Sequence, residues 1–254
     1  MSAKKDREKR REERLQRESE AAENARRQRL IKLGSAAAFL AIVAVVVAVV
    51  VSQSGTSGGD TELENVAEVE TGLANIPQHR LTLGLPTAKV KLVEFGDLQC
   101  PVCRDFAVKV LPELIQNKVR SGDARIEFRN FPILGPESIK AAPAAIAAGE
   151  QNRGWDFIEL FYKNQGIEQT GYVTEEFLTS IAKGAKVVDI PRWNRDRRSA
   201  AAKNEVKRTT GEAERLGFGG TPSFAIEGPG TNGLEPLGTL GSLGEFEEAI
   251  DAAA

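Results

Sequence analysis

The chain has 254 residues, 41% of them hydrophobic and 28% charged, and a formal net charge of −2 at pH 7. A chain of this length and apolar content can fold, and it suffices for one sizeable domain with additional segments. There are only two cysteines and one histidine, His79, which lies far upstream of both cysteines. A zinc site with four Cys or His ligands therefore cannot form within one chain, and we expect no metal and no cofactor.

The first segment, residues 1–32, is rich in Lys and Arg with acidic residues interleaved. Alternating charges at helical spacing are typical of a solvated segment, so we expect no nucleic-acid partner. Residues 33–51 are uncharged and mostly aliphatic. As a helix they would extend over about 28 Å, close to the thickness of a bilayer core, which predicts a single transmembrane helix.

The distribution of charge around this stretch predicts its orientation. Basic residues precede it, whereas residues 52–79 contain no Lys or Arg. The N-terminus is therefore expected in the cytoplasm and the rest of the chain outside it, in a single-pass protein of the cell membrane. A cleaved signal peptide is the alternative, and the sequence leaves it open; the length of the stretch favours an uncleaved anchor.

Residues 52–80 are predicted to be a flexible linker, since they begin with a Gly/Ser-rich run and continue as a mixed, acidic segment. The apolar run at 90–95 then predicts a buried strand. Residues 100 to about 119 predict a helix with a kink at Pro112, and alternation at 125–131 predicts a second strand. A right-handed crossover would make these two strands parallel neighbours.

The next eighty or so residues, from Ser138 to Leu216, have helical patterns throughout, including a capped helix after Thr174 and a long charged helix at 196–216. A strand at 223–226, a short strand around 236–240 and a helix at 243–253 complete the prediction. The predicted order is a βαβ unit, a helical insertion and a ββα unit.

Both cysteines lie in Cys100-Pro101-Val102-Cys103, where the first strand passes into the helix. Free N–H groups and the helix dipole at such a position lower a thiol pKa, which makes Cys100 the expected nucleophile. Cys103 lies one turn further on, close enough to form a disulfide and to release a bound partner. Pro101 suits the first helical position. An inert structural disulfide is the less favoured reading, because so short a loop restrains the unfolded chain little.

Two motifs, FGDLQCPVCRDF and, more than a hundred residues later, GFGGTPSFAI, occur in this order. This arrangement resembles the DsbA-like branch of the thioredoxin superfamily. The resemblance implies an α/β thioredoxin-like fold over residues 81–254, with a helical insertion at about 135–216. It also implies that Pro222 is cis beside the sulfur atoms, and that the backbone of Thr221 pairs with an extended substrate segment. Pro101 and Val102 are expected to complete the substrate-binding surface.

The resemblance assigns a role to Glu94, six positions before Cys100. Thioredoxin-like proteins have a buried acid there, and the resemblance implies that Glu94 relays the proton of Cys103. The alternative is a strand residue that faces water. The best-known oxidases of the family have histidine where this chain has Val102, and valine gives the thiolate neither a hydrogen bond nor a charge. Asp97 and Gln99 are expected to shape the loop rather than react.

These observations predict a membrane-anchored thiol-disulfide oxidoreductase that forms disulfides in extracytoplasmic proteins. We expect a monomer whose partners are protein thiols and disulfides and a membrane redox partner that resets the CxxC pair. A disulfide reductase or isomerase is the nearest alternative; isomerases dimerise through an added domain, for which the segment before Leu81 is short. A non-catalytic peptide-binding module is the other, and the intact CxxC argues against it.

Overall fold

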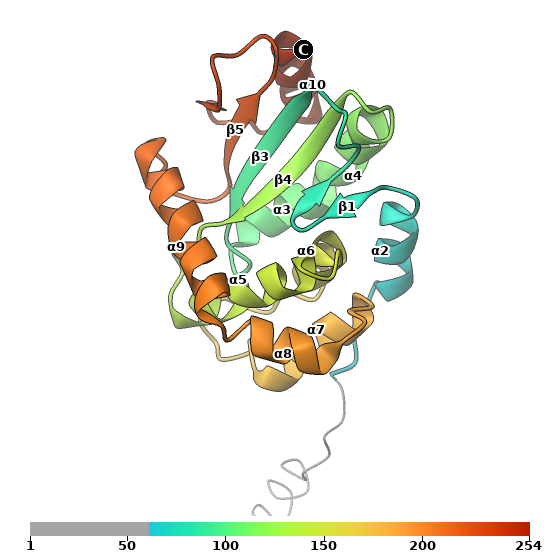
Figure 1. Ribbon diagram of the computed structural model, residues 1–254, viewed down its shortest axis with the longest axis vertical. Coiled ribbons are helices and arrows are strands. Elements are labelled where there is room, and N and C mark those ends of the chain that lie inside the picture. The colour runs from blue at the N-terminus through green and yellow to red at the C-terminus, as the bar shows by residue number, and fades with distance from the viewer. Residues whose placement is uncertain (1–60) are drawn as a thin grey trace, which may run out of the picture. The chain divides into compact units, whose positions relative to one another are not determined.

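The computed structural model describes residues 61–254, so the predicted cytoplasmic segment 1–32, the predicted transmembrane helix 33–51 and the first part of the predicted linker lie outside the described residues. Within residues 61–254, every helix is too short or too polar to cross a bilayer. The described chain forms a single sheet with helices on both faces (Figure 1).

The sheet has six strands in the order β1-β2-β4-β3-β5-β6. Its centre is the parallel pair of β3 (Val90–Gly96) and β4 (Ala124–Asn130), as the βαβ pattern predicts. The strand β5 (Ser223–Glu227) pairs with β3 in the antiparallel direction. The remaining strands have two residues each: β1 (Gln78–His79), β2 (Thr82–Leu83) and β6 (Glu235–Pro236). The predicted strand at 236–240 is therefore shorter and ends at Pro236.

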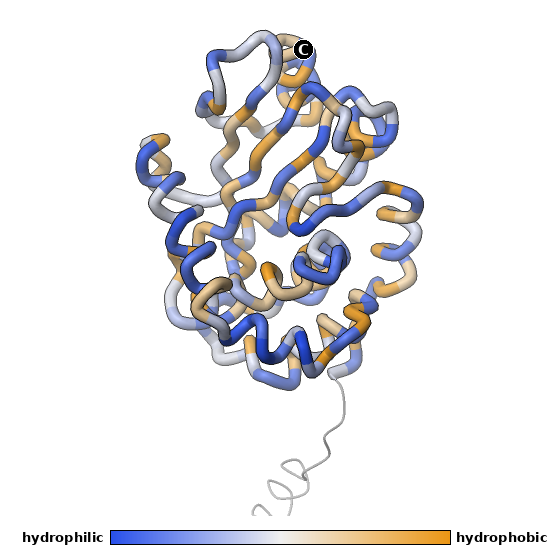
Figure 2. The backbone as a smooth tube through the Cα atoms, viewed as in Figure 1, coloured by the Kyte–Doolittle hydropathy of each residue, from blue (hydrophilic) through white to orange (hydrophobic). Residues whose placement is uncertain are grey.

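The first face of the sheet is covered by the helices that follow β3 and end the chain. These are α3 (Pro101–Lys109), α4 (Leu111–Leu114), a π-helical turn (Ile115–Val119) and α10 (Leu243–Ala253). The single helix predicted for 100–119 is thus divided, because Pro112 has no N–H to continue the helix and starts a new one. Hydrophobic and hydrophilic residues alternate along the central strands (Figure 2), and Leu92 and Ile126 belong to the core shared with these helices.

Five helices separate β4 from β5 in the chain: α5 (Pro136–Gly149), α6 (Gly154–Lys163), α7 (Glu175–Gly184), α8 (Ile190–Asp196) and α9 (Ala200–Arg215). As predicted, α7 begins after Thr174, whose side chain accepts a hydrogen bond from the N–H of Phe177. The helix predicted to start at Asp196 starts at Ala200 instead, because Ser199 caps it by accepting from the N–H of Ala202. Residues 165–173 are not helical.

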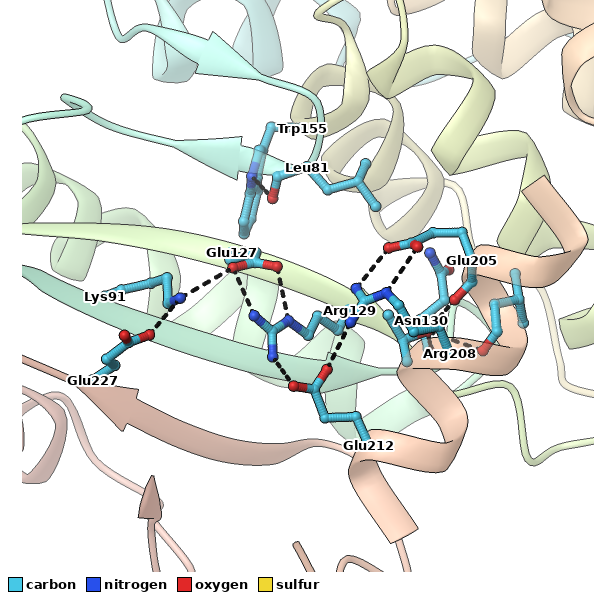
Figure 3. A network of polar contacts seen from close by, with 12 residues as sticks. Leu81, Lys91, Glu127, Arg129, Asn130, Trp155, Glu205, Arg208, Glu212 and Glu227 are labelled. Atoms are coloured by element: carbon cyan, nitrogen blue, oxygen red, sulfur yellow. Dashed lines mark hydrogen bonds and ion pairs between the residues drawn. The ribbon is translucent and has the colours of Figure 1, made fainter. Parts of the chain in front are cut away.

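The second face of the sheet carries α9, and the contact is both apolar and ionic. Val93 and Phe95 pack against Ala213 of α9. Beside them, the guanidinium group of Arg129 binds Glu127 at 2.7 Å and Glu212 of α9 at 2.8 Å (Figure 3). The same guanidinium lies 5.7 Å from the centre of the Phe95 ring. The helix that leads to the Thr221-Pro222 loop is therefore fixed to the sheet at its C-terminal half.

Residues 61–80 differ from the expectation of a flexible linker. The helix α2 (Val66–Leu73) buries Val69 and Leu73 against the main core. The β1-β2 hairpin then joins the sheet through β4, and the indole N–H of Trp155 donates to the carbonyl of Leu81 at 2.9 Å. The linker prediction was based on the acidic composition of this segment and did not use the helical spacing of its apolar residues.

Replacement of Leu73 by alanine tests this correction. Because Leu73 is 6% exposed in α2, Leu73→Ala should lower the free energy of unfolding by about 2–5 kcal/mol, as for other buried leucines. The control is Leu85→Ala at a residue that is 41% exposed, which should cost less than about 1 kcal/mol. Urea unfolding followed by tryptophan fluorescence measures both, and equal stability of the two variants would mean that α2 is not part of the domain.

Candidate active site

The two cysteines lie at the start of α3, where β3 passes into the helix. Cys100 occupies the N-cap position in an extended conformation, and Pro101 follows in the first turn. The backbone N–H of Cys100 donates to the carbonyl of Asp97 at 2.9 Å. Both cysteines are free thiols, so the structure describes the reduced pair.

The loop before Cys100 is fixed by Asp97, which is buried. Its carboxylate accepts from the N–H of Gln99 at 2.9 Å and from the N–H groups of Ile133 and Leu134 at 2.8 and 2.9 Å. Gln99 in turn donates to the hydroxyl of Ser138 at 3.0 Å. Both side chains shape the loop, as the sequence predicts, and connect it to the start of the helical insertion.

The two thiols have opposite pKa shifts. The pKa of Cys100 is lowered to about 6, and the largest cause is a hydrogen bond from Cys103. Burial opposes this shift. Hydrogen bonds from the Thr221 side chain and from the N–H groups of Cys103 and Val102 lower the pKa further. Burial, the same bond to Cys100, and the charge of Glu94 raise the pKa of Cys103 well above its usual range. Cys100 is thus a thiolate at neutral pH, whereas Cys103 keeps its proton.

The Thr221-Pro222 loop lies beside Cys100, although 121 residues separate Thr221 from it in the sequence. The peptide bond between Thr221 and Pro222 is cis. The Cys100 sulfur atom lies 3.2 Å from the carbonyl oxygen of Thr221, to which Cys100 donates when it is protonated. Thr221 and Pro222 are half-buried, while Pro101 and Val102 are exposed, Val102 at 58%. These four residues surround a sulfur atom that is itself buried.

Glu94 points to the face of the sheet that carries α3, because it alternates with Val93 and Phe95, which face α9. It is 1% exposed, so the alternative of a water-facing residue is wrong. Burial is the main cause that raises the pKa of Glu94, followed by the charges of Glu159 and Cys100. Burial therefore favours the protonated form of Glu94, whose charge when ionised acts on Cys103.

Sequence reasoning missed the residues that the helical insertion contributes. The hydroxyl of Tyr162 donates to the carbonyl of Asp97 at 3.2 Å, and Gln165 donates to the carbonyls of Leu98 and Cys100 at 2.8 and 3.1 Å. Glu159 of α6 is buried close enough to Glu94 to raise its pKa. The only sequence signal for Glu159 was an acid within an otherwise apolar stretch of α6.

In the described part of the chain, no three His, Cys, Asp or Glu side chains gather as metal ligands do. The site places Cys100, whose pKa is lowered, beside Cys103 and Glu94, whose pKa values are raised. This set suits thiol-disulfide exchange, in which one sulfur attacks and the other resolves.

Comparisons with known proteins agree with this chemistry. A family model described as Thioredoxin matches residues 77–245. The chain is 35% identical over 150 residues to a probable disulfide bond formation protein D of Bacillus cereus, a match that covers 58% of this chain and 69% of that protein. It is 27% identical over 148 residues to disulfide bond formation protein D of Bacillus subtilis, and this match covers 57% of this chain and 66% of that protein. A Na(+)/H(+) antiporter NhaA 1 of Mycolicibacterium gilvum is 27% identical over 158 residues, which are 60% of this chain and 24% of the antiporter.

Solved structures share the fold. Oxidised BdbD of Bacillus subtilis superposes with a TM-score of 0.60 at 22% identity, covering 69% of this chain and 95% of BdbD. A thioredoxin-like oxidoreductase of Silicibacter pomeroyi gives a TM-score of 0.55 at 29% identity, and the match covers 72% of this chain and 96% of that protein. The chain belongs to the thioredoxin family and, within it, to the DsbA-like thiol-disulfide oxidoreductases.

The pKa of Cys100 provides a direct test of the site geometry. Cys103→Ala removes the hydrogen bond that lowers this pKa most. Loss of a hydrogen bond to a charged group costs about 1.5–3 kcal/mol, so alkylation of Cys100 by iodoacetamide at pH 6 should slow about tenfold. Cys103→Ser keeps a donor and is the control, with a rate close to that of the wild type. Equal rates for the alanine and serine variants would show that the bond does not set the pKa.

Proposed function

We propose that the chain is a membrane-anchored oxidase that forms disulfides in extracytoplasmic proteins through its Cys100-Cys103 pair. One observation carries the proposal: the Cys100 thiolate is stabilised while its partner Cys103 is buried and protonated. A stabilised thiolate favours the reduced form of the pair, and a pair that prefers to be reduced oxidises its substrates.

In the proposed reaction, a substrate thiolate attacks the Cys100 sulfur of the Cys100-Cys103 disulfide. The bond between the two cysteines breaks, Cys103 leaves as a thiolate, and a mixed disulfide joins Cys100 to the substrate. A second substrate thiolate attacks the substrate sulfur of that bond, forms the substrate disulfide and expels the Cys100 thiolate. Two electrons pass from the substrate dithiol to the cysteine pair, and a membrane redox partner later removes them.

Glu94 is proposed to supply a proton in this reaction. Cys103 leaves as an anion at a position with no exposed surface, where an unpaired charge is unfavourable. Glu94 is buried, burial raises its pKa well above the usual range, and when it is ionised its charge raises the pKa of Cys103. Proton transfer from Glu94 to the departing Cys103 thiolate would neutralise it, and the reverse transfer would activate Cys103 for attack.

The substrate is proposed to lie across the exposed Pro101 and Val102 and the half-buried Thr221 and Pro222. Thr221 leads directly into β5, so its backbone is presented in the extended direction to which a peptide strand can pair. The apolar side chain of Val102, 58% exposed, lies next to the reactive sulfur. This surface would accept extended, partly apolar segments with a cysteine at their centre.

The location of the enzyme is part of the proposal. Residues 33–51 would cross the membrane with residues 1–32 in the cytoplasm, and the domain would act outside as a monomer. A match to about a quarter of an antiporter chain supports a membrane setting for this type of domain. The reductase alternative is favoured by one feature, Val102, since a valine gives the thiolate no charge.

Activity assays with the full chain separate the two directions. The oxidised chain should accelerate the refolding of reduced ribonuclease A at least several-fold, and Cys100→Ser should abolish this activity because no mixed disulfide can form. Reduction of insulin by the reduced chain should be weak by comparison. Fast insulin reduction without ribonuclease refolding would contradict the oxidase proposal and favour the reductase.

A further inference from the structure

We propose that a cavity beside the cysteine pair, between α3 and the loop after α6, is a second substrate-binding subsite, in which Arg104 selects substrate segments that have an acidic residue next to the reactive cysteine. The inference rests on the proposed oxidase function and narrows its substrate class. It gives the loop after α6, residues 165–168, a part in substrate recognition.

The cavity has a volume of about 420 Å³, within the range of about 300–1,000 Å³ that is typical of binding pockets. Gln99, Pro101 and Arg104 at the start of α3 line it together with residues 165–168. Gln99 and Pro101 are the immediate neighbours of Cys100 in the chain. Because an extended chain advances about 3.3 Å per residue, a substrate joined to Cys100 reaches the cavity with the residues next to its cysteine.

The loop after α6 is held against the start of α3. The side-chain amide of Gln165 donates to the carbonyls that precede and follow Gln99, at 2.8 and 3.1 Å. The N–H of Gln169 donates to the side-chain oxygen of Gln99 at 3.0 Å. Gly166 lies close to the ring of Tyr172, since a Cβ atom at Gly166 would be 2.8 Å from that ring. The cavity is therefore formed before a substrate arrives, which lowers the entropic cost of binding.

Arg104 is the cation of this cavity. It lies one helical turn after Cys100, and its N–H donates to the carbonyl of Cys100 at 3.1 Å. Arg104 is exposed, and its side chain has no hydrogen bond or ion pair within residues 61–254. The next two charged residues of α3 bind each other, Lys109 to Asp105 at 2.9 Å. The guanidinium group is thus available to a carboxylate, to which it can donate two parallel hydrogen bonds.

The loop after α6 contributes a negative charge and an apolar side chain. Glu168 is exposed and has no partner in the part of the chain that the structure describes, and Ile167 is 77% exposed. Glu168 repels a second acidic residue. Arg104 outweighs it for a residue next to the substrate cysteine, because it lies one turn from Cys100 and can bind a carboxylate with two hydrogen bonds. We therefore expect one acidic residue beside the cysteine rather than an acidic run.

Arg104 takes no part in the exchange of bonds. The substrate thiolate attacks the Cys100 sulfur, and the two electrons of the substrate dithiol pass to the Cys100-Cys103 pair, as in the proposed reaction. Arg104 changes only how firmly a given substrate segment is held while this occurs. It is a specificity-determining residue, and its removal should change which substrates react fastest.

The test compares substrates of opposite charge with the full chain. Three synthetic peptides contain two cysteines and differ only in the residues on both sides of the first cysteine, which are Glu, Gln or Lys. The oxidised chain oxidises each peptide at pH 7 and low ionic strength, and acid quenching with chromatography gives the rates. The quantity measured is the ratio of the rate for the Glu peptide to the rate for the Lys peptide. Because these residues also alter the pKa of the peptide thiol, only the change of this ratio between protein variants is interpreted.

Arg104→Gln should lower the ratio about threefold and Glu168→Gln should raise it about twofold, the size of effect that exposed charge pairs have. Both changes should shrink in about 0.5 M NaCl, which screens such pairs. The matched control is Arg195→Gln, the same change at an exposed arginine of α8 that does not line the cavity. It should leave the ratio as in the wild type.

The outcomes separate the inference from the proposed function. A ratio that is the same in the wild type, Arg104→Gln and Glu168→Gln would overturn the inference and leave the oxidase proposal intact. The inference would also be overturned if Arg195→Gln lowered the ratio as much as Arg104→Gln, since the net charge of the domain would then set the preference. If the wild type oxidised none of the peptides, the proposed function itself would fail, and the inference with it.

Discussion

The antiparallel pairing of β3 with β5 is the constraint on which the site depends. Phe95 of β3 lies opposite Ser223 of β5, so the cis-proline loop that precedes Ser223 reaches the end of β3 where Cys100 begins α3. A register shift of one residue would turn Glu94 toward α9 and Phe95 toward the thiols. Gly96 is part of the same arrangement: a Cβ atom there would lie 2.4 Å from the ring of Phe128 and 3.1 Å from the carboxyl group of Glu94.

Burial and local hydrogen bonds divide the titratable groups of the site into two kinds. Cys100 has bonds that stabilise its anion, and its pKa falls. Cys103, Glu94 and Glu159 are desolvated, and their pKa values rise. The resulting site pairs one nucleophile whose anion is stabilised with three groups whose protonated forms are favoured by burial. Negative charge is therefore favoured on Cys100 and disfavoured on the more deeply buried groups around it.

Much of this site could be predicted from the sequence, because its strongest signals are local. The CxxC motif directly after an apolar run predicted Cys100 at a helix N-terminus, and the acid six positions earlier fell within the apolar run that predicted a buried strand. The Thr221-Pro222 motif was predicted beside the sulfurs by family resemblance, and the structure has it 3.2 Å from Cys100. The roles of Glu94, Thr221 and Pro222 in the reaction stay predictions.

The parts that sequence reasoning missed depend on tertiary packing. Tyr162 reaches the loop before Cys100 because α6 of the insertion packs against α3, and no spacing rule connects Tyr162 to Cys100. The segment 61–80 was expected to be a linker, since its acidic composition is typical of solvated chain. Leu73 is nevertheless buried, and its helix α2 packs against α6, which is distant in the sequence. The start of α9 was misplaced because the cap at Ser199 is a local hydrogen bond within a charged run.

The central claim is that a stabilised Cys100 thiolate makes the pair an oxidant. The reduction potential of the Cys100-Cys103 disulfide, measured by equilibrium titration of the full chain with glutathione, tests it most directly. The account predicts a potential more positive than the roughly −270 mV of thioredoxin. A potential at or below that value would mean that the thiolate is not stabilised enough to drive oxidation, and would contradict the account.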